Sequence, residues 1–297
     1  MIAHGFLVID KDPAMTSHDV VAMGRRALNT RKVGHAGTLD PMATGVLVLG
    51  FGNGTRLLQY VTNGDKSYLA TVVLGAATIT DDHEGEITST ADVSAVTDAA
   101  IENELAKMRG TIAQRPSSVS AVKVDGERAH ARVRAGEVFE LPARIVKISN
   151  LEIVEIRRVE NRIEVDIDVT CSAGTFIRAI ARDCGSALGV GGHLNKLRRT
   201  RVAGFGLDRT FSIAALKAQD FTPLTMADVA RATFAVRTVS ADEAIELSFG
   251  RALIANSTDE ITAAISAADE VLALLQNKEG KALPIAFRGG AVMGFTV

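Results

Sequence analysis

Residues 34–50 read GHAGTLDPMATGVLVLG, and this stretch passes from a glycine-rich loop directly into an unbroken apolar run. The apolar run, residues 45–50, is typical of a buried strand. The proline that follows Asp40 biases Asp40 away from the helical region and toward an extended or turn backbone. A carboxylate held in this way can act as a nucleophile, a base or a stabiliser of charge. Local chemistry alone favours a simpler interpretation, a tight turn in which Asp40 accepts backbone hydrogen bonds.

The elements on either side of this loop alternate between strand and helix without a regular βαβ rhythm. Periodicity and turn signals predict strands over residues 5–10, 45–50, 67–74, 118–124 and 163–169. They predict helices over residues 17–29, with Ser17 as the N-cap, and over 55–62, 98–108, 127–134 and 176–188. Together these elements predict an α+β fold with a mixed, mostly antiparallel sheet and flanking helices.

The pattern changes after about residue 222. The C-terminal stretch predicts a helix over 242–249, a weaker helix over 261–267, and two strands over 271–275 and 283–287 that flank a turn. These elements are enough for a small appended domain. We therefore expect two domains, residues 1–222 and residues 223–297.

Composition excludes several classes of protein. The chain has 297 residues, of which 47% are hydrophobic and 23% charged, an ordinary balance for a globular protein. Its two cysteines, Cys171 and Cys184, offer neither a disulfide framework nor a metal-ligand cluster, so we expect a reducing, cytoplasmic location and no metal. The N-terminus lacks the pattern of a secretory signal, and no run approaches the roughly 18 apolar residues of a membrane span.

Charge is unevenly distributed along the chain. The overall net charge is −2, but residues 105–210 carry +7, between flanks of −6 and −3. A basic middle third between acidic flanks is compatible with a polyanionic partner such as a nucleic acid. An arginine-rich solvated surface explains the same counts, so charge alone leaves both interpretations open.

Five motifs resemble, in order and spacing, those of the TruB family of tRNA pseudouridine synthases. Residues 34–47 resemble the family signature, and residues 5–11, GFLVIDK, resemble its first motif. Residues 66–68, KSY, are similar to the segment that carries a family tyrosine. Residues 171–178, CSAGTFIR, and 191–200, GGHLNKLRRT, are similar to the later motifs. The resemblance covers about residues 5–215 and implies a pseudouridine synthase fold, followed by a small C-terminal domain similar to PUA domains.

The resemblance also implies a reaction. Family members isomerise the uridine at position 55 in the T loop of tRNA to pseudouridine, breaking the N1–C1′ bond, turning the base and rejoining it through C5, without a cofactor or metal. Asp40 matches the aspartate nucleophile, Arg178 the arginine that pairs with it, and Tyr68 the tyrosine that packs against the target base and is a candidate base for the C5 proton. A covalent bond to the nucleophile retains one half of the substrate while the other half rotates.

Five further residues are implied to contact the substrate. Leu197 matches an apolar residue that forms the floor of the pocket. His35 matches a histidine that fills the position in the base stack that the flipped base leaves, and Asp82 matches an aspartate that helps to hold the flipped region. Unstacking a base costs a few kcal/mol, and a ring that takes its place recovers part of that cost. Lys123 and Phe176 are the other two residues that are implied to contact the substrate.

Each of these residues also has an ordinary structural interpretation. Without the resemblance, Arg178 is a helix arginine in a surface ion pair, Tyr68 a half-buried strand aromatic, Leu197 a core residue and His35 a hydrogen-bonding loop residue.

Two positions depart from the family pattern. Phe176 stands where bacterial members usually have tyrosine, so the ring is retained and the hydroxyl is lost. Ile79 stands where an acidic residue is common. Neither departure alters the implied nucleophile.

Residues 115–140 are similar to the thumb, an insertion that closes over the RNA stem-loop. Its cationic side chains suit phosphate contacts that release counterions: Arg115, Lys123, Arg128, His130, Arg132 and Arg134. We therefore expect the T stem-loop of tRNA as the partner, no membrane, no obligate protein partner and a monomer. Two alternatives remain: an RNA-binding helper of tRNA folding with minor or lost isomerase activity, and a pseudouridine synthase acting on ribosomal RNA.

Overall fold

The computed structural model describes residues 3–117 and 141–286, together with the backbone of residues 123–124 and 127–128. The first part of the chain runs through these elements: β1 (Gly5–Lys11), α1 (Ser17–Ala27), β2 (Val33–His35), β3 (Thr44–Phe51), the 3-10 helix η1 (Gly52–Arg56), α2 (Leu58–Asn63), β4 (Lys66–Leu74), β5 (Ala76–Thr78), β6 (Ile87–Thr90), α3 (Asp98–Ala106) and β7 (Gly110–Gln114).

The middle of the chain adds β8 (Lys123–Val124), β9 (Glu127–Arg128), β10 (Arg144–Val159), β11 (Arg162–Cys171), α5 (Ile177–Ala187), β12 (Gly192–Val202), β13 (Phe205–Gly206), the 3-10 helix η2 (Leu207–Arg209), β14 (Phe211–Ser212) and α6 (Ile213–Ala218). The C-terminal part contains α7 (Met226–Thr233), β15 (Ala235–Thr238), α8 (Ala241–Ser248), β16 (Leu253–Ile254), β17 (Thr262–Ile265), β18 (Val271–Lys278) and β19 (Lys281–Ala286).

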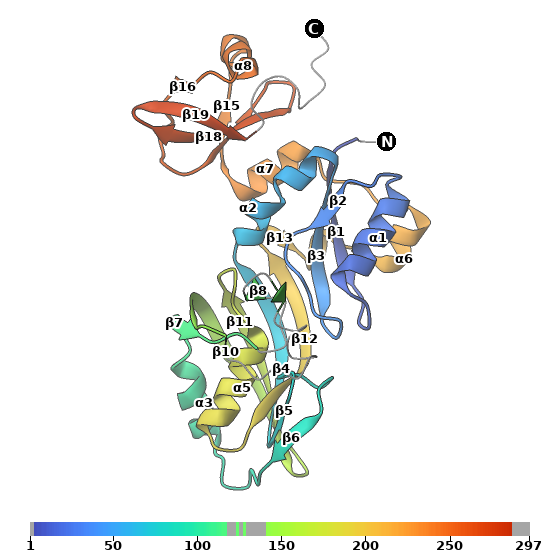
Figure 1. Cartoon of the computed structure of the whole chain (residues 1–297), viewed down its shortest axis with the longest axis vertical. Coiled ribbons are helices and arrows are strands. Elements are labelled where there is room, and N and C mark those ends of the chain that lie inside the picture. The colour runs from blue at the N-terminus through green and yellow to red at the C-terminus, as the bar shows by residue number, and fades with distance from the viewer. Residues whose placement is uncertain (1–2, 118–122, 125–126, 129–140, 287–297) are drawn as a thin grey trace.

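A long mixed sheet organises the first 222 residues (Figure 1). Its strand order is β14-β1-β3-β12-β4-β11-β10-β7, with β2 paired to β3 and β13 to β12. Only two of its pairings, β1 with β14 and β3 with β12, are parallel. Strand β12 comes late in the chain, yet it lies in the middle of the sheet and joins the N-terminal strands to β4 and its neighbours. The predicted α+β fold with a mostly antiparallel sheet is confirmed.

Two apolar clusters pack on opposite faces of the sheet. One buries alternate residues of the strands against α1, α3, α5 and α6. The other buries Phe6 and Val8 of β1 and Val46 and Val48 of β3 against α2, α7 and the C-terminal strands β17 and β18. The alternation of a strand explains the division, because neighbouring residues such as Leu7 and Val8 point to opposite faces.

The C-terminal strands form a separate five-stranded sheet of order β15-β17-β18-β19-β16, with α8 packed against β18. Figure 1 shows this sheet at one end of the molecule, beyond α7. The bridge between Phe6 and Leu224 and the shared apolar cluster connect it to the long sheet. The division at residues 222/223 and the likeness to PUA domains stay predictions.

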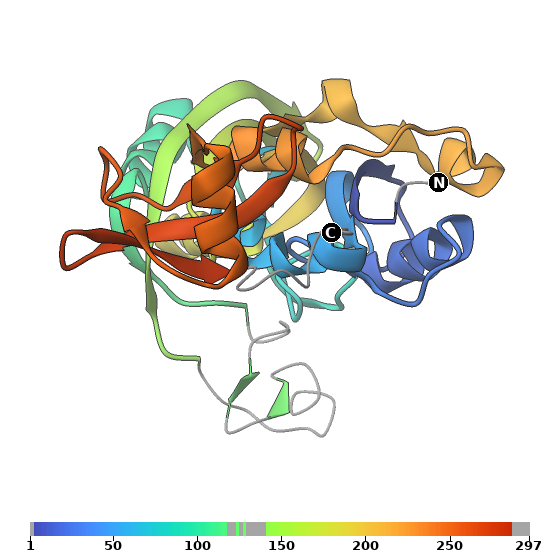
Figure 2. The same cartoon turned by 90° about the horizontal axis from the view of Figure 1, so that it is seen from above.

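Several predicted elements differ in detail from the structure. The N-cap of α1 is Thr16, whose side chain accepts from the Asp19 backbone in a capping box, and Ser17 instead bonds the backbone of Leu39. Residues 262–265 form a buried strand rather than part of a helix. Glu127 and Arg128 belong to a short hairpin, so the helix predicted from residue 127 does not begin there. This hairpin stands off from the body of the molecule in Figure 2. The rest of the predicted strand 118–124 and helix 127–134 lies outside the described residues.

Candidate active site

The loop that carries Asp40 is held by a buried arginine on β12. Arg199 is 1% exposed, and its guanidinium donates to the carbonyl oxygens of Val46 (2.7 Å), Gly37 (3.1 Å) and Thr38 (3.3 Å). Gly45 lies beside the Arg199 backbone at φ +101°, where an added Cβ would come 2.1 Å from the Arg199 carbonyl oxygen. Only glycine permits so close an approach in this conformation. The fold therefore fixes the loop directly to the middle strand of the sheet.

A buried lysine holds the other side of the loop. Lys11, at the end of β1, donates through Nζ to the carbonyl oxygens of Met15 (2.8 Å), Asp12 (2.9 Å) and Pro41 (3.2 Å). Burial lowers its pKa to about 8, against an opposing effect of Asp40. The Ser17 hydroxyl adds a pair of hydrogen bonds to the backbone of Leu39. The backbone is thus anchored on both sides of Asp40, whose side chain remains 34% exposed.

Arg178 joins the Asp40 carboxylate to a second acidic group. Its Nε lies 3.0 Å from Asp40 Oδ2, and its Nη1 lies 3.3 Å from Asp82 Oδ2 and donates to the Thr80 carbonyl at 2.8 Å. The Arg178 side chain is 9% exposed and that of Asp82 5%. A guanidinium fixed at several points aims the carboxylate that it binds. Arg178 therefore differs from an ordinary surface ion pair.

Asp82 is itself held by its own loop. Its Oδ1 accepts from the Thr80 hydroxyl (2.5 Å) and from the Glu84 backbone (3.1 Å). This carboxylate is thereby fixed on the side of Arg178 away from Asp40.

A small cavity opens at Asp40. It measures about 150 Å³, below the roughly 300–1,000 Å³ of pockets for drug-sized ligands, and so suits a single flat ring. Its lining comes from the Asp40 loop, from β4, from β12 and from the start of α5: Thr38, Leu39, Asp40, Tyr68, Thr175, Phe176, Ile177, Arg178 and Leu197. Five predicted site residues, Asp40, Tyr68, Phe176, Arg178 and Leu197, are thus brought together from four separate segments.

Tyr68 and Leu197 form a buried wall of this cavity, each 7% exposed. Burial raises the pKa of the Tyr68 phenol, and the charge of Arg199, its partner in the β4–β12 register, opposes that rise. In the free protein Tyr68 therefore carries its proton at neutral pH. A role as base requires the bound substrate to shift that equilibrium.

Two of the predicted substrate-binding residues lie outside the cavity lining. His35, on β2, is half-buried with its ring edge-on to that of His18, 5.7 Å between centroids. Burial is the largest cause of a lowered His35 pKa, which favours the neutral ring. Asp82 acts on the cavity only through Arg178. The Lys123 side chain lies outside the described residues, as does most of the predicted thumb.

Sequence reasoning missed the residues that hold the site together. Lys11 and Arg199 lie within the motifs, but the resemblance implies no role for either. A lysine that ends a strand of buried residues was one available signal, because a buried amine must find acceptors. Over the residues that the structure describes, no group of three or more His, Cys, Asp or Glu side chains is placed to hold a metal ion. Within the same residues, no helix is long and apolar enough to cross a membrane.

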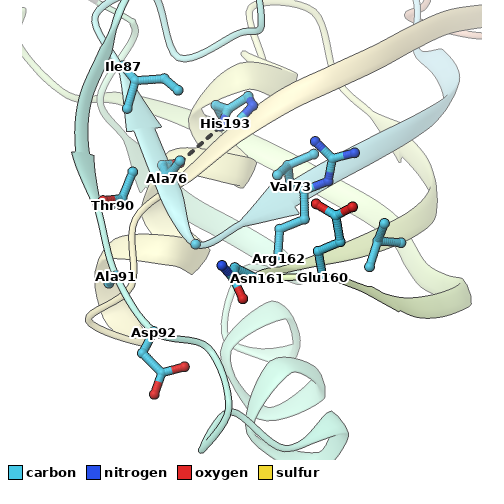
Figure 3. Close-up of a pocket in the computed structure, with 12 residues that line it drawn as sticks. Val73, Ala76, Ile87, Thr90, Ala91, Asp92, Glu160, Asn161, Arg162 and His193 are labelled. Atoms are coloured by element: carbon cyan, nitrogen blue, oxygen red, sulfur yellow. Dashed lines mark hydrogen bonds between the residues drawn. The ribbon is translucent and has the colours of Figure 1, made fainter.

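A larger hollow of about 740 Å³ lies at the far end of β4 and β12, and Figure 3 shows its lining. His193 Nδ1 and the Ala76 carbonyl lie 2.9 Å apart on one wall, and charged Asp92, Glu160 and Arg162 border the rest. None of the predicted site residues lines this hollow.

Comparison with known proteins agrees with the motifs. Family models match three consecutive parts of the chain: "TruB family pseudouridylate synthase (N terminal domain)" over residues 25–177, "tRNA pseudouridylate synthase B C-terminal domain" over 178–234, and "tRNA Pseudouridine synthase II, C terminal" over 234–287.

Curated relatives match over nearly the whole length. The chain is 47% identical over 286 residues to the tRNA pseudouridine synthase B of Corynebacterium diphtheriae, covering 95% of each protein. It is 50% identical to that of Cutibacterium acnes, covering 93% of this chain and 94% of the relative. Among solved structures, a Cbf5-Nop10-Gar1 complex superposes with a TM-score of 0.69 at 25% identity, covering 95% of this chain and 83% of the other. The chain belongs to the TruB family of pseudouridylate synthases.

Proposed function

We propose that the protein converts uridine 55 in the T loop of tRNA to pseudouridine, with Asp40 as the nucleophile. Family membership carries the reaction type, the isomerisation of uridine to pseudouridine in tRNA. The observation that supports the assignment of residues is the position of Asp40: its carboxylate is partly exposed at the mouth of a ring-sized cavity, 3.0 Å from a buried guanidinium.

The proposed chemistry begins at the Asp40 carboxylate. It attacks either the ribose C1′ or the base, the N1–C1′ bond breaks, and the base turns within the cavity. The base then bonds to C1′ through C5. The C5 proton leaves, N1 is protonated, and Asp40 is released. Covalent attachment keeps one half of the substrate in place during the turn.

The residues around the cavity have complementary roles in this proposal. Arg178 orients the nucleophile through Nε and remains fixed because Asp82 and the Thr80 carbonyl both hold its Nη1. Leu197 and Phe176 contact the flat faces of the base, and Tyr68 stands beside it as the candidate base for the C5 proton. His35, neutral and half-buried, is available to occupy the stack that the flipped uridine leaves.

Binding of tRNA in this proposal depends on shape and phosphate contacts. RNA loops are recognised by their folded shape and their splayed bases. The basic middle third of the chain supplies cations for the phosphates. The protein acts as a monomer in the cytoplasm without an obligate protein partner, and its thumb at 115–140 contacts the stem-loop.

The test is turnover by an Asp40→Asn variant, measured as tritium release from a tRNA transcript labelled at uridine C5. The amide retains the shape of the side chain and loses the nucleophile, so we expect no turnover. The Kd for tRNA should stay within about tenfold of the wild-type value, or roughly 1.4 kcal/mol. Asp220→Asn, an exposed change after α6, is the matched control and should behave like wild type.

Turnover by Asp40→Asn within a few-fold of wild type would contradict the assignment. Sequencing for pseudouridine across the RNA of a deletion strain separates the two alternatives. Loss in ribosomal RNA alone identifies a ribosomal enzyme, and unchanged pseudouridine identifies a folding helper.

A further inference from the structure

Helix α5, which carries Arg178, begins without a side-chain cap of its own. Its N-cap residue is Phe176, which makes no side-chain hydrogen bond to the helix. N-caps are usually Ser, Thr, Asp or Asn, whose oxygens satisfy the free backbone groups at the start of a helix. The beginning of α5 must therefore be fixed by another part of the chain.

That part is Gln114, the last residue of β7. Its Oε1 accepts from the Phe176 backbone N–H at 2.8 Å, and its Nε2 donates to the Phe176 carbonyl at 3.1 Å. The Gln114 side chain is buried, with the residue 3% exposed. One amide thus satisfies both backbone groups of a residue 62 positions away.

A second contact lies about one turn beyond Arg178 on α5. Arg182 donates through Nη2 to the Arg115 carbonyl at 2.7 Å and through Nη1 to Asp81 Oδ2 at 3.2 Å. Asp81 Oδ2 also accepts from the buried Ser117 hydroxyl at 2.6 Å. Residues 114–117 are therefore braced against α5 at two points and against the loop that carries Asp81 and Asp82.

The two braced elements are the ones that place Arg178. The start of α5 carries Phe176, whose side chain lines the cavity, and Arg178 two residues later. The neighbouring loop carries Thr80 and Asp82, which hold the Arg178 guanidinium. A misplacement of about 1 Å at reacting groups can cost on the order of a hundredfold in rate, even when its cause is remote.

We propose that Gln114 is a positioning residue for the isomerisation: by clamping the backbone of Phe176 it sets the start of α5 and aims Arg178 at Asp40. Arg182, Asp81 and Ser117 support the same register from one turn away. The proposal rests on the proposed roles of Asp40 and Arg178. It assigns Gln114 no contact with RNA.

The first test is a Gln114→Met variant, which is similar in size and lacks both hydrogen-bonding groups. We expect the single-turnover rate at saturating tRNA to fall by about ten- to a hundredfold, while the Kd for tRNA stays within about threefold. Loss of a positioning residue lowers the rate of the chemical step and leaves the affinity for tRNA intact.

The control uses a similar clamp elsewhere in the chain. Asn277, on β18, accepts from the Asn256 backbone N–H at 2.8 Å and donates to the Asn256 carbonyl at 2.9 Å. An Asn277→Leu variant loses the matching pair of bonds in the C-terminal sheet, together with bonds to the Thr258 carbonyl and Asp259 Oδ1. It should therefore lower thermal stability at least as much and leave the single-turnover rate within about twofold. If Gln114→Met loses stability but keeps the wild-type rate, Gln114 is merely structural and the proposal fails.

A Gln114→Glu variant gives a readout that depends on protonation. Its carboxylate accepts from the Phe176 N–H but repels the Phe176 carbonyl, and its protonated form donates to that carbonyl and restores the clamp. Burial raises the pKa of such a carboxyl. We expect the ratio of the variant's rate to that of wild type to rise at least about fivefold between pH 8 and pH 5.5.

A constant ratio would overturn the proposal, and this measurement decides the matter if Gln114→Met does not fold. If Asp40→Asn is inactive while Gln114→Met keeps the wild-type single-turnover rate, this inference fails and the proposed function stands. An active Asp40→Asn defeats the proposed function itself.

Discussion

Two buried arginines, Arg199 and Arg178, hold Asp40 from two sides and bind different partners. On the loop side, Arg199, together with Lys11, binds carbonyl oxygens of the backbone. On the helix side, Arg178 binds the carboxylates of Asp40 and Asp82. Both guanidinium groups are almost fully buried. The difference lies in the partners: Arg199 binds neutral backbone carbonyls, whereas Arg178 binds two carboxylates as well as the Thr80 carbonyl.

The partners indicate what each side contributes. Carbonyl acceptors fix the path of the backbone, and removing their donor leaves several buried oxygens without a bond. Carboxylate partners fix the direction of side chains. We therefore expect Arg199 on the loop side to have the larger effect on stability and Arg178 on the helix side to have the larger effect on turnover.

The sharpest test of this contrast applies the same substitution to both arginines. Arg178→Met should lower turnover by about a thousandfold, or about 4 kcal/mol, because Asp40 loses the group that orients it. Single-turnover tritium release measures it. If Arg178→Met keeps the wild-type rate and pH–rate profile, Arg178 does not orient Asp40 and the contrast between the two arginines is wrong.

Arg199→Met should instead lower the free energy of unfolding by about 3 kcal/mol, since three buried carbonyl groups lose their donor at about 1 kcal/mol or more each. Urea unfolding of both variants measures the difference. Arg178→Met losing more stability than Arg199→Met would reverse the assignment of the two sides.

The pH dependence of Lys11 tests the loop side alone. Its folded-state pKa is about 8, against 10.5 in an unfolded chain. Below pH 8 the ammonium holds the Pro41 carbonyl, so turnover should fall about tenfold between pH 7 and pH 9 as the proton is lost. Over the window from pH 8 to 10.5 the unfolded chain binds more protons than the folded one, so this group makes the free energy of unfolding rise with pH.

Lys66 provides the control for this profile. Burial also lowers its pKa to about 8, and its side chain lies beside Gly37, but its Nζ donates to the carbonyls of Thr62 and Gly64 rather than to a carbonyl of the Asp40 loop. A Lys66→Met variant should therefore keep the alkaline fall in turnover. If turnover by Lys66→Met no longer falls between pH 7 and pH 9, the alkaline fall belongs to Lys66 and not to Lys11.

The smallest expected effect concerns Phe176 on the helix side. Its ring lines the cavity and Gln114 fixes its backbone, so Phe176→Tyr should change the single-turnover rate by less than about fivefold, or roughly 1 kcal/mol. Phe176→Ala should cost far more, because it opens a space beside Arg178. A marked gain in Phe176→Tyr would show that a hydroxyl matters there, since a hydrogen bond to a charged group contributes about 1.5–3 kcal/mol.

How far the sequence could predict this molecule differs from element to element. Strand β11 was predictable because Ile163, Val165, Ile167 and Val169 alternate with acidic residues. Strand β12 was not predictable from its pattern, because lysine and arginine obscure its alternation and Arg199 is buried. Residues 262–265 were predicted as helix because a short apolar run fits either element, and only the neighbouring strands decide.

The site shows the same limit. Motif order indicated Asp40, Tyr68, Arg178 and Leu197, and the structure gathers them around one cavity. The bond from Gln114 to Phe176 was not predictable, because it joins residues 62 positions apart through backbone groups that every residue possesses.

The late position of β12 in the chain has a consequence for synthesis on the ribosome. Strands β1 and β3 emerge early, and β4, β10 and β11 follow, but the two groups share no pairing until residues 192–202 arrive between them. Asp40 and Tyr68 belong to different groups, and Arg199 and Leu197 arrive with β12 itself. A nascent chain shorter than about 200 residues therefore has no assembled cavity. The cavity can therefore assemble only after about two-thirds of the 297 residues have been synthesised, and non-local pairings of this kind form slowly.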